Sequence, residues 1–186
     1  MNLDEIKAGL KPIVAGCVLH GEFTLSSGKK SDFYFDGRLA TLRADGLHLI
    51  GRAVLAMIEG EGVAAVGSIP VGADPMTGAA VALAGSDGVE LTGFLVRKEP
   101  KKHGTGKQVE GPQPPAGSRV VILEDTITTG GSVVRGIEAV RREWDVEVAA
   151  VIVLVDRLEG GREAIEAAGV DLWPIFTRED FDGQEG

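Results

Sequence analysis

Cysteine is almost absent from this chain. Cys17 is the single one among 186 residues, so neither a disulfide within the chain nor a thiolate metal cluster can form. A lone thiol fits a reducing cytoplasm. Cys17 lies in an apolar run, residues 13–19, where a buried and unreactive thiol is a better interpretation than a nucleophile.

Aromatic and basic residues are also scarce. Only 6 Phe, 2 Trp and 1 Tyr are present, so the core must be built from Val, Leu, Ile and Ala. Basic residues number 19 against 28 acidic ones, and a net charge of -9 repels nucleic acids and anionic membranes. No apolar run is long enough to cross a bilayer, and the first ten residues carry acids where a signal peptide carries bases. We therefore expect a cytoplasmic protein that binds neither nucleic acid nor membrane.

Apolar strands alternate with helical segments over most of the chain. Helices are expected at 44–59, 75–84, 132–144 and 162–168, and strands at 63–69, 91–96, 119–123, 146–155 and 170–175. This alternation predicts an α/β fold, an open and mostly parallel sheet flanked by helices, in a single domain over 1–186. Before it, a helix from Leu3 is expected to be limited by Pro12, and residues 18–38 are expected to be extended with a turn at 26–28.

One segment, residues 98–117, interrupts the alternation. It has no apolar periodicity and is rich in Lys, Gly and Pro. A loop of this length without regular structure is uncommon inside a compact domain and is usually a functional lid or a linker. Because strands and helices resume directly after it, the sequence favours a mobile lid.

The strongest chemical signal is a strand, turn and helix around residue 124. The apolar run at 120–123 leads into Glu124 and Asp125, then into a turn of Thr and Gly at 126–131, and then into a helix that begins near Ser132. Ligands bind at the carboxyl ends of strands in open α/β sheets, and a helix N-terminus attracts phosphate. The alternative is that the acids merely end the strand and Ser132 merely caps the helix. Two adjacent acids before such a turn favour a binding site.

Two further segments carry polar chemistry. Residues 97–104 hold five residues that are basic or can become so, in an acidic protein, which suits a polyanion that binds and leaves. A solvated charged loop is the alternative interpretation. Residues 23–38 combine a Ser-Ser-Gly turn with a strand that contains Tyr34 and Phe35, aromatic residues that would ordinarily belong to a core.

Together these motifs resemble the orotate branch of the type I phosphoribosyltransferases. The matching elements are the acid pair with its Thr/Gly turn, the Arg-Lys-Glu-x-Lys-x-His-Gly run from Arg97, the Ser-Gly element, and Asp156-Arg157 after a strand. The resemblance covers residues 4–178. It implies that residues 1–40 form an N-terminal hood, that 98–117 form a flexible catalytic loop, and that the activity transfers phosphoribosyl from phosphoribosyl pyrophosphate (PRPP) to orotate in pyrimidine (UMP) synthesis.

The resemblance also implies roles for individual residues. PRPP would be bound by Arg97, Lys98, Lys101, His103, Glu124, Asp125, Thr126, Ile127, Thr128, Thr129, Gly130, Gly131 and Ser132. Orotate would be bound by Thr128, Arg157, Tyr34 and Phe35. Lys101 and His103 would act catalytically on the leaving pyrophosphate. Mg²⁺ would arrive with PRPP, and the family forms homodimers in which the loop reaches the neighbouring site.

Two positions depart from the family pattern. Many members carry Lys where this chain has Ser26, so Ser26 cannot supply that charge, and either Lys29 or Lys30 supplies it or no residue does. A Lys-Gly pair is common near the position of Asp74, which reverses the charge. We expect Asp74 either to contact Mg²⁺ through water or to cap the helix that begins at Pro75.

Three other functions fit parts of the sequence. A purine or uracil phosphoribosyltransferase would share the acid pair and turn but not the loop motif or Asp156-Arg157. A PRPP-sensing regulator would need no cationic loop and usually carries a DNA-binding segment, which the net charge of -9 disfavours. A generic nucleotide-binding module leaves the loop unexplained.

Overall fold

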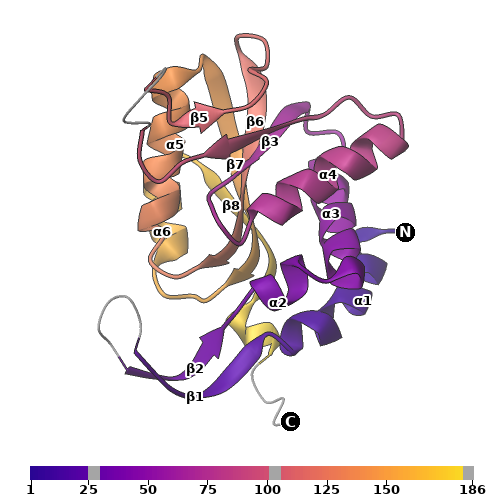
Figure 1. The fold of residues 1–186 in the computed structure, drawn as a ribbon, viewed down its shortest axis with the longest axis vertical. Coiled ribbons are helices and arrows are strands. Elements are labelled where there is room, and N and C mark those ends of the chain that lie inside the picture. The colour runs from indigo at the N-terminus through magenta and orange to yellow at the C-terminus, as the bar shows by residue number, and fades with distance from the viewer. Residues whose placement is uncertain (25–29, 101–105, 182–186) are drawn as a thin grey trace.

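The structure is a computed structural model that describes residues 1–24, 30–100 and 106–181. A sheet of six strands forms its centre, in the order β5-β4-β3-β6-β7-β8 (Figure 1). The helices are α1 (Leu3–Ala15), α2 (Arg38–Thr41), α3 (Ala44–Ile58), α4 (Asp74–Ser86), α5 (Gly131–Glu143) and α6 (Gly161–Ala167), with a 3-10 turn at Arg178–Asp180. The strands are β1 (Val18–Thr24), β2 (Lys30–Phe35), β3 (Val63–Ser68), β4 (Thr92–Val96), β5 (Val109–Glu110), β6 (Ser118–Ile127), β7 (Val146–Asp156) and β8 (Asp171–Thr177).

The expected open α/β architecture is confirmed. Strands β3, β4, β6, β7 and β8 pair in parallel, and only β5 at the edge is antiparallel to its neighbour. Helices α1, α3 and α4 cover one face of the sheet, and α5 and α6 cover the other. Successive residues of β6 show why its sequence is continuously apolar: Val121 and Leu123 pack in the first core, Val120 and Ile122 in the second.

The first helix does not end where the sequence suggested. We expected Pro12 to limit it, but α1 continues to Ala15. Proline removes one backbone donor within a helix, yet Val14 beyond it is fully buried and the Gly16 N–H bonds to the Pro12 carbonyl at 3.4 Å. Burial of that last turn therefore outweighs the lost hydrogen bond. Because α1 packs against α3, it belongs to the main core as well as to the N-terminal segment.

The extended N-terminal segment is confirmed as a two-stranded antiparallel ribbon, β1 with β2, which projects beyond the sheet at one end of the molecule (Figure 1). The turn expected at 26–28 lies outside the described residues. Cys17, at the start of the ribbon, is buried, and burial followed by the charge of Asp36 raises the pKa of its thiol to about 11. The expectation of a buried, unreactive cysteine is thereby supported.

The interruption of the alternating pattern is shorter than expected. Within residues 98–117, for which we expected no regular structure, the structure contains β5, and Val109 is 2% exposed. Pairing of Val96 with Val109 ties the segment back to the sheet. A two-residue strand is too short for periodicity to detect, which explains the error.

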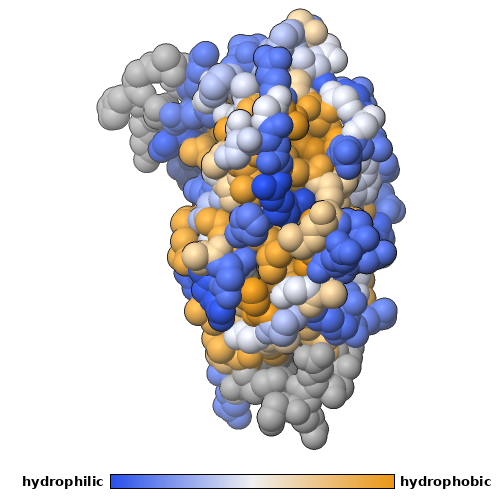
Figure 2. Space-filling view, turned by 90° about the vertical axis from the view of Figure 1, so that its right-hand side faces the viewer, coloured by the Kyte–Doolittle hydropathy of each residue, from blue (hydrophilic) through white to orange (hydrophobic). Residues whose placement is uncertain are grey.

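No helix of the described chain has both the length and the apolar character required to cross a membrane. On the side covered by α1, α3 and α4, apolar surface shows between charged and polar side chains (Figure 2). The opposite side carries α5 and α6.

Candidate active site

The acid pair lies inside a strand rather than after it. Strand β6 continues through Glu124 and Asp125 to Ile127, because β7 stays paired beside it as far as the contact of Ile127 with Asp156. On the other side β3 has already ended at Ser68. The two carboxylates are therefore held by a regular ladder on one side and open toward the loop after β3 on the other. Glu124 is 7% exposed and Asp125 is half-buried.

Burial changes the acidity of both groups. It is the largest cause that raises the pKa of Glu124 well above 4.5, followed by the charge of Asp125, with a smaller effect from Asp74. Burial also raises the pKa of Asp125, although the Glu124 side chain acts in the opposite direction through a hydrogen bond. Carboxylates that lack water readily accept hydrogen bonds from a ligand's hydroxyl groups.

The Asp125 carboxylate lies against two glycine backbones. A Cβ atom built on Gly72 would lie 2.0 Å from Asp125 Oδ2, and one on Gly37 would lie 2.8 Å from it. Gly72 belongs to the loop after β3 and Gly37 directly precedes α2. Distant segments thus meet at this acid, with no room for side chains. Sequence reasoning missed both glycines; Gly72 in the short loop directly after a buried strand was the available signal.

Asp74 does not cap its helix. The N-cap position is Ala73, and the Asp74 side chain makes no capping bond, so that prediction was wrong. Instead its carboxylate accepts a hydrogen bond of 2.6 Å from the hydroxyl of Ser68, a fully buried residue that sequence reasoning had missed. This bond orients Asp74 at the end of β3, close enough to Glu124 to contribute to its raised pKa.

The turn between β6 and α5 is built for close approach of backbones. Gly130 has φ 74° and occupies the N-cap of α5, so Ser132 is not the cap. A Cβ on Gly161, which begins α6, would lie 2.1 Å from Ile127 Cγ2, and one on Gly130 would lie 2.9 Å from the Gly161 carbonyl. The turn is thus packed on α6, and the first N–H groups of α5 are left for a ligand. Within the described chain the buried Thr126 hydroxyl has no hydrogen-bond partner.

Arg157 is buried beside this turn. Its N–H donates to the Ile127 carbonyl at 3.0 Å, and its side chain is 5% exposed. The guanidinium forms an ion pair of 2.8 Å with Glu159. Asp156, fully buried, accepts the N–H of Leu158 at 2.9 Å and so shapes the loop. An incoming carboxylate would have to share the guanidinium with Glu159.

The two aromatic residues of β2 occupy different environments. Phe35 is 5% exposed and packs in the core, whereas Tyr34 is half-buried with its ring centroid 5.5 Å from that of Phe23. Neighbouring residues of a strand point to opposite faces, so only Tyr34 is available to a ligand. Asp36, which had been given no role, accepts hydrogen bonds of 2.7 and 2.9 Å from Arg38, and this pairing lowers the pKa of the Asp36 carboxyl.

The expected cations follow β4. Arg97 and Lys98 are exposed, and Arg97 forms an ion pair of 3.1 Å with Glu110. Lys101 and His103 lie outside the described residues, as do Ser26 and Lys29. No group of three His, Cys, Asp or Glu in the described parts of the chain is arranged to hold a metal ion directly.

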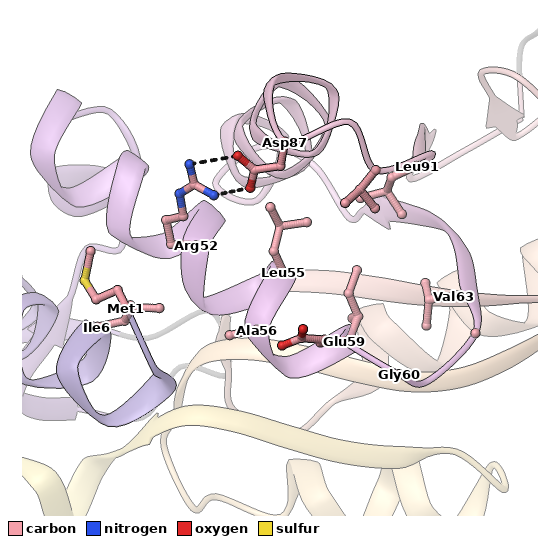
Figure 3. Close-up of a pocket in the computed structure, with 13 residues that line it drawn as sticks. Met1, Ile6, Arg52, Leu55, Ala56, Glu59, Gly60, Val63, Asp87 and Leu91 are labelled. Atoms are coloured by element: carbon pink, nitrogen blue, oxygen red, sulfur yellow. Dashed lines mark hydrogen bonds and ion pairs between the residues drawn. The ribbon is translucent and has the colours of Figure 1, made fainter.

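A separate pocket of about 420 Å³ lies at the opposite ends of the strands (Figure 3). Apolar side chains such as Leu55, Val63 and Leu91 line it, and the ion pair between Arg52 and Asp87 lies at its side. Since Val63 begins β3, this pocket is at the amino ends of the parallel strands, away from Glu124. Ligands of open α/β sheets bind at the carboxyl ends, so the pocket is not the candidate site.

Comparison with solved structures defines the class. The structure matches orotate phosphoribosyltransferase from Mycobacterium tuberculosis with a TM-score of 0.81 and 36% identity, over 95% of this chain and 99% of that one. The orotate phosphoribosyltransferase of Aeropyrum pernix matches at 0.70 and 31% over 95% and 96%. An adenine phosphoribosyltransferase from Thermoanaerobacter pseudethanolicus shares the fold at 0.61 with 18% identity. The fold and the site therefore place the protein among the type I phosphoribosyltransferases.

Sequence comparison identifies the branch. Orotate phosphoribosyltransferase from Rhodopirellula baltica is 48% identical over 191 residues, which cover 97% of this chain and 98% of the relative. That from Aquifex aeolicus is 42% identical over 154 residues, 83% of each chain. The chain belongs to the orotate phosphoribosyltransferase family, and it is an enzyme of the glycosyltransferase type. A search against models of protein families found none that matches.

Proposed function

We propose that this enzyme transfers the phosphoribosyl group of PRPP to a ring nitrogen of orotate, giving orotidine 5′-monophosphate and pyrophosphate in UMP synthesis. The observation that carries the proposal is the acid pair Glu124 and Asp125 inside β6, followed by a glycine-containing turn at the N-terminus of α5. A sugar phosphate needs both features side by side.

PRPP would lie along the end of β6. The backbone N–H groups of residues 126–132 would hold its 5′-phosphate, aided by the positive end of the α5 dipole. Glu124 and Asp125 would accept hydrogen bonds from the ribose hydroxyls. These bonds would stabilise the ionised carboxylates and so offset the burial that raises both pKa values. A carboxylate pair would repel the phosphate itself, which favours the sugar as its partner.

Orotate would lie between the same turn and the N-terminal ribbon. Thr128 and Arg157 would bind its polar edge and carboxylate, since a guanidinium matches a carboxylate with two parallel hydrogen bonds. Tyr34 would pack beside the ring. Phe35, buried in the core, would support the ribbon.

Pyrophosphate would leave toward the loop after β4. Positive charge develops on the ribose as the bond to pyrophosphate breaks, so no side-chain nucleophile is required. Arg97, Lys98, Lys101 and His103 would stabilise the leaving group, and a closed loop would keep water from the sugar.

Mg²⁺ is the proposed cofactor. Mg²⁺ prefers oxygen ligands, and the carboxylate of Asp74, which the Ser68 hydroxyl orients, offers such oxygens beside the acid pair. When bound with PRPP, the ion would neutralise pyrophosphate charge, and Asp74 would hold it through water.

We also propose a cytoplasmic homodimer in which the loop serves the neighbouring site. Helix α5 has 13 residues and so spans roughly 18 Å, with the phosphate turn at its beginning and the base of the loop at its end. This separation favours a loop that extends away from its own turn. Apolar surface on the side of α1, α3 and α4 suits contact between subunits (Figure 2).

The direct test is to mix the protein with PRPP, Mg²⁺ and orotate and to follow the loss of orotate absorbance. We expect turnover that requires all three, stops with a chelator, and is absent with uracil, adenine or hypoxanthine in place of orotate. Turnover of another base, or none with orotate, would contradict the proposal.

A further inference from the structure

The two ends of the segment between β4 and β5 are bonded to each other. The Arg97 N–H donates to the Gln108 carbonyl at 2.9 Å, and the Gln108 side-chain amide donates back to the Arg97 carbonyl at 2.8 Å. Gln108 is only 8% exposed, so this amide is committed to its bonds. The backbone of Arg97, where the loop begins, is therefore held in place by Gln108, where the loop ends.

Helix α5 holds the closing residue in turn. The carboxylate of Glu143, its last residue, accepts the backbone N–H groups of Gln108 at 2.9 Å and Val109 at 3.0 Å. Arg142 donates to the Gln108 side-chain oxygen at 2.8 Å. Every polar atom of the Gln108 side chain is therefore used, and one charged group satisfies two consecutive backbone donors.

We propose that Glu143 and Gln108 are positioning residues that fix where Arg97 and Lys98 leave the sheet, and so where these cations meet pyrophosphate. We call the contacts of Arg97, Gln108, Arg142 and Glu143 the stem clamp. This inference rests on the proposed function. Its physical basis is that a cation stabilises a leaving group only when it is held at the place where charge develops, and small misplacements greatly reduce rates.

The position of the stem clamp supports a kinetic role. It joins the sheet edge to α5, the helix whose first turn is the proposed phosphate site. The Arg97 side chain is about half exposed, and Glu110, with which it forms an ion pair, is also partly exposed, so this pair contributes little rigidity. The backbone of Arg97, fixed through Gln108, is therefore what determines its location.

The test compares variants of one helix. Glu143→Ala should lower kcat roughly 10-fold to 100-fold, the scale of a misplaced catalytic group, while KM for orotate changes little. The melting temperature should fall modestly, because two backbone donors lose their acceptor. Glu143→Gln keeps one accepting oxygen and should fall in between. Glu138→Ala, five residues earlier on the same helix and exposed, should match the wild type. An unchanged kcat in Glu143→Ala, or an equal loss in Glu138→Ala, overturns the proposal.

A second variant tests whether the clamp acts as a unit. Gln108→Leu should reduce kcat to a similar extent, and the double variant with Glu143→Ala should be little worse than either single change. If the loss of kcat in the double variant equals the product of the two single losses, the residues act independently, which contradicts a shared clamp.

Hydrogen exchange separates this inference from the proposed function. In the wild type the amides of Gln108 and Val109 should exchange slowly, and in Glu143→Ala quickly. If these amides exchange slowly in a wild type that does not turn over orotate, the proposed reaction is contradicted but the clamp contacts are supported. If they exchange quickly in the wild type, the stem clamp is contradicted, whatever the activity.

Discussion

The acids of β6 and the cations after β4 lie at the same level of the sheet but are held in opposite ways. Leu123 and Leu95 both pair with Ser68, so Asp125 and Arg97 each stand two residues beyond the same position of β3. Asp125 stays inside a ladder, whereas Arg97 has left its strand.

The two halves of the site are positioned by different interactions. The acids are placed by backbone pairing and burial, at a cost in desolvation that raises their pKa values. The cations are placed by hydrogen bonds at the base of a loop and remain solvated. The acid side is suited to holding PRPP throughout the reaction, and the cationic side to a group that departs.

Removal of both acids should have the largest effect. The double variant Glu124→Gln with Asp125→Asn should weaken PRPP binding by about 10³-fold, because each charge-assisted bond is worth about 1.5–3 kcal/mol. Calorimetric titration with PRPP measures this, and orotate bound to the PRPP-free enzyme serves as the control. If the double variant binds PRPP normally but turns over slowly, the acids of β6 act on turnover and not on binding, which contradicts the role proposed for them.

Removal of one loop cation should act on turnover instead. Lys101→Ala should lower kcat by roughly 10²-fold, the scale of one lost preorganised donor, with a smaller effect on orotate affinity. Steady-state kinetics at saturating substrates provides the measurement. If kcat is unchanged and only KM for PRPP rises, the loop binds the substrate in its ground state and the comparison fails.

Arg157→Lys tests the base-binding side of the same turn. The charge is kept but the two-pronged geometry is lost, so orotate should bind roughly 10-fold more weakly while PRPP affinity holds. Titration of each ligand separately distinguishes the two. Equal losses for both would place Arg157 in the scaffold of the turn and not at the carboxylate of orotate.

The smallest expected effect concerns pH. A carboxyl whose pKa is raised by folding stabilises the protein at low pH, and that contribution is lost as pH rises through the raised pKa. PRPP affinity should change in the other direction, because an ionised carboxylate accepts hydrogen bonds from the ribose hydroxyls more strongly than a neutral carboxyl group does. Between the ordinary value of 4.5 and the raised pKa, falling pH should stabilise the free enzyme and weaken PRPP binding.

Comparison with Glu124→Gln isolates this effect, because Asp125 and Asp36 remain in both proteins. The difference in melting temperature between wild type and variant should vary across that window and be flat outside it. A constant difference at all pH values would show that burial does not perturb Glu124.

Much of the fold was predictable because its signals are local. The continuous apolar runs of β6 and β7, with helices between strands, predict a parallel sheet covered on both faces, and the acid pair with its turn predicts a ligand site at the end of β6. The structure confirms this architecture. The roles of individual residues in binding and catalysis stay predictions.

The errors arose where distant residues decide the outcome. The buried Val14 carries α1 past Pro12, and pairing with β7 extends β6 through its acids. Asp74 bonds to Ser68 in place of its own helix, and β5 exists through its pairing with β4. None of these contacts produces a hydrophobic periodicity that could be recognised in the sequence.

The succession of strands and helices along the chain and the acidic end of β6 follow from the sequence alone, because hydrophobic periodicity and turn residues act between near neighbours. Three features depend on the packing of distant segments: Asp125 lies against Gly37 and Gly72, Phe35 is buried while Tyr34 is half-buried, and Glu143 holds the base of the loop. These outcomes depend on which backbones approach one another when the sheet and its helices pack, and that is a property of the whole chain.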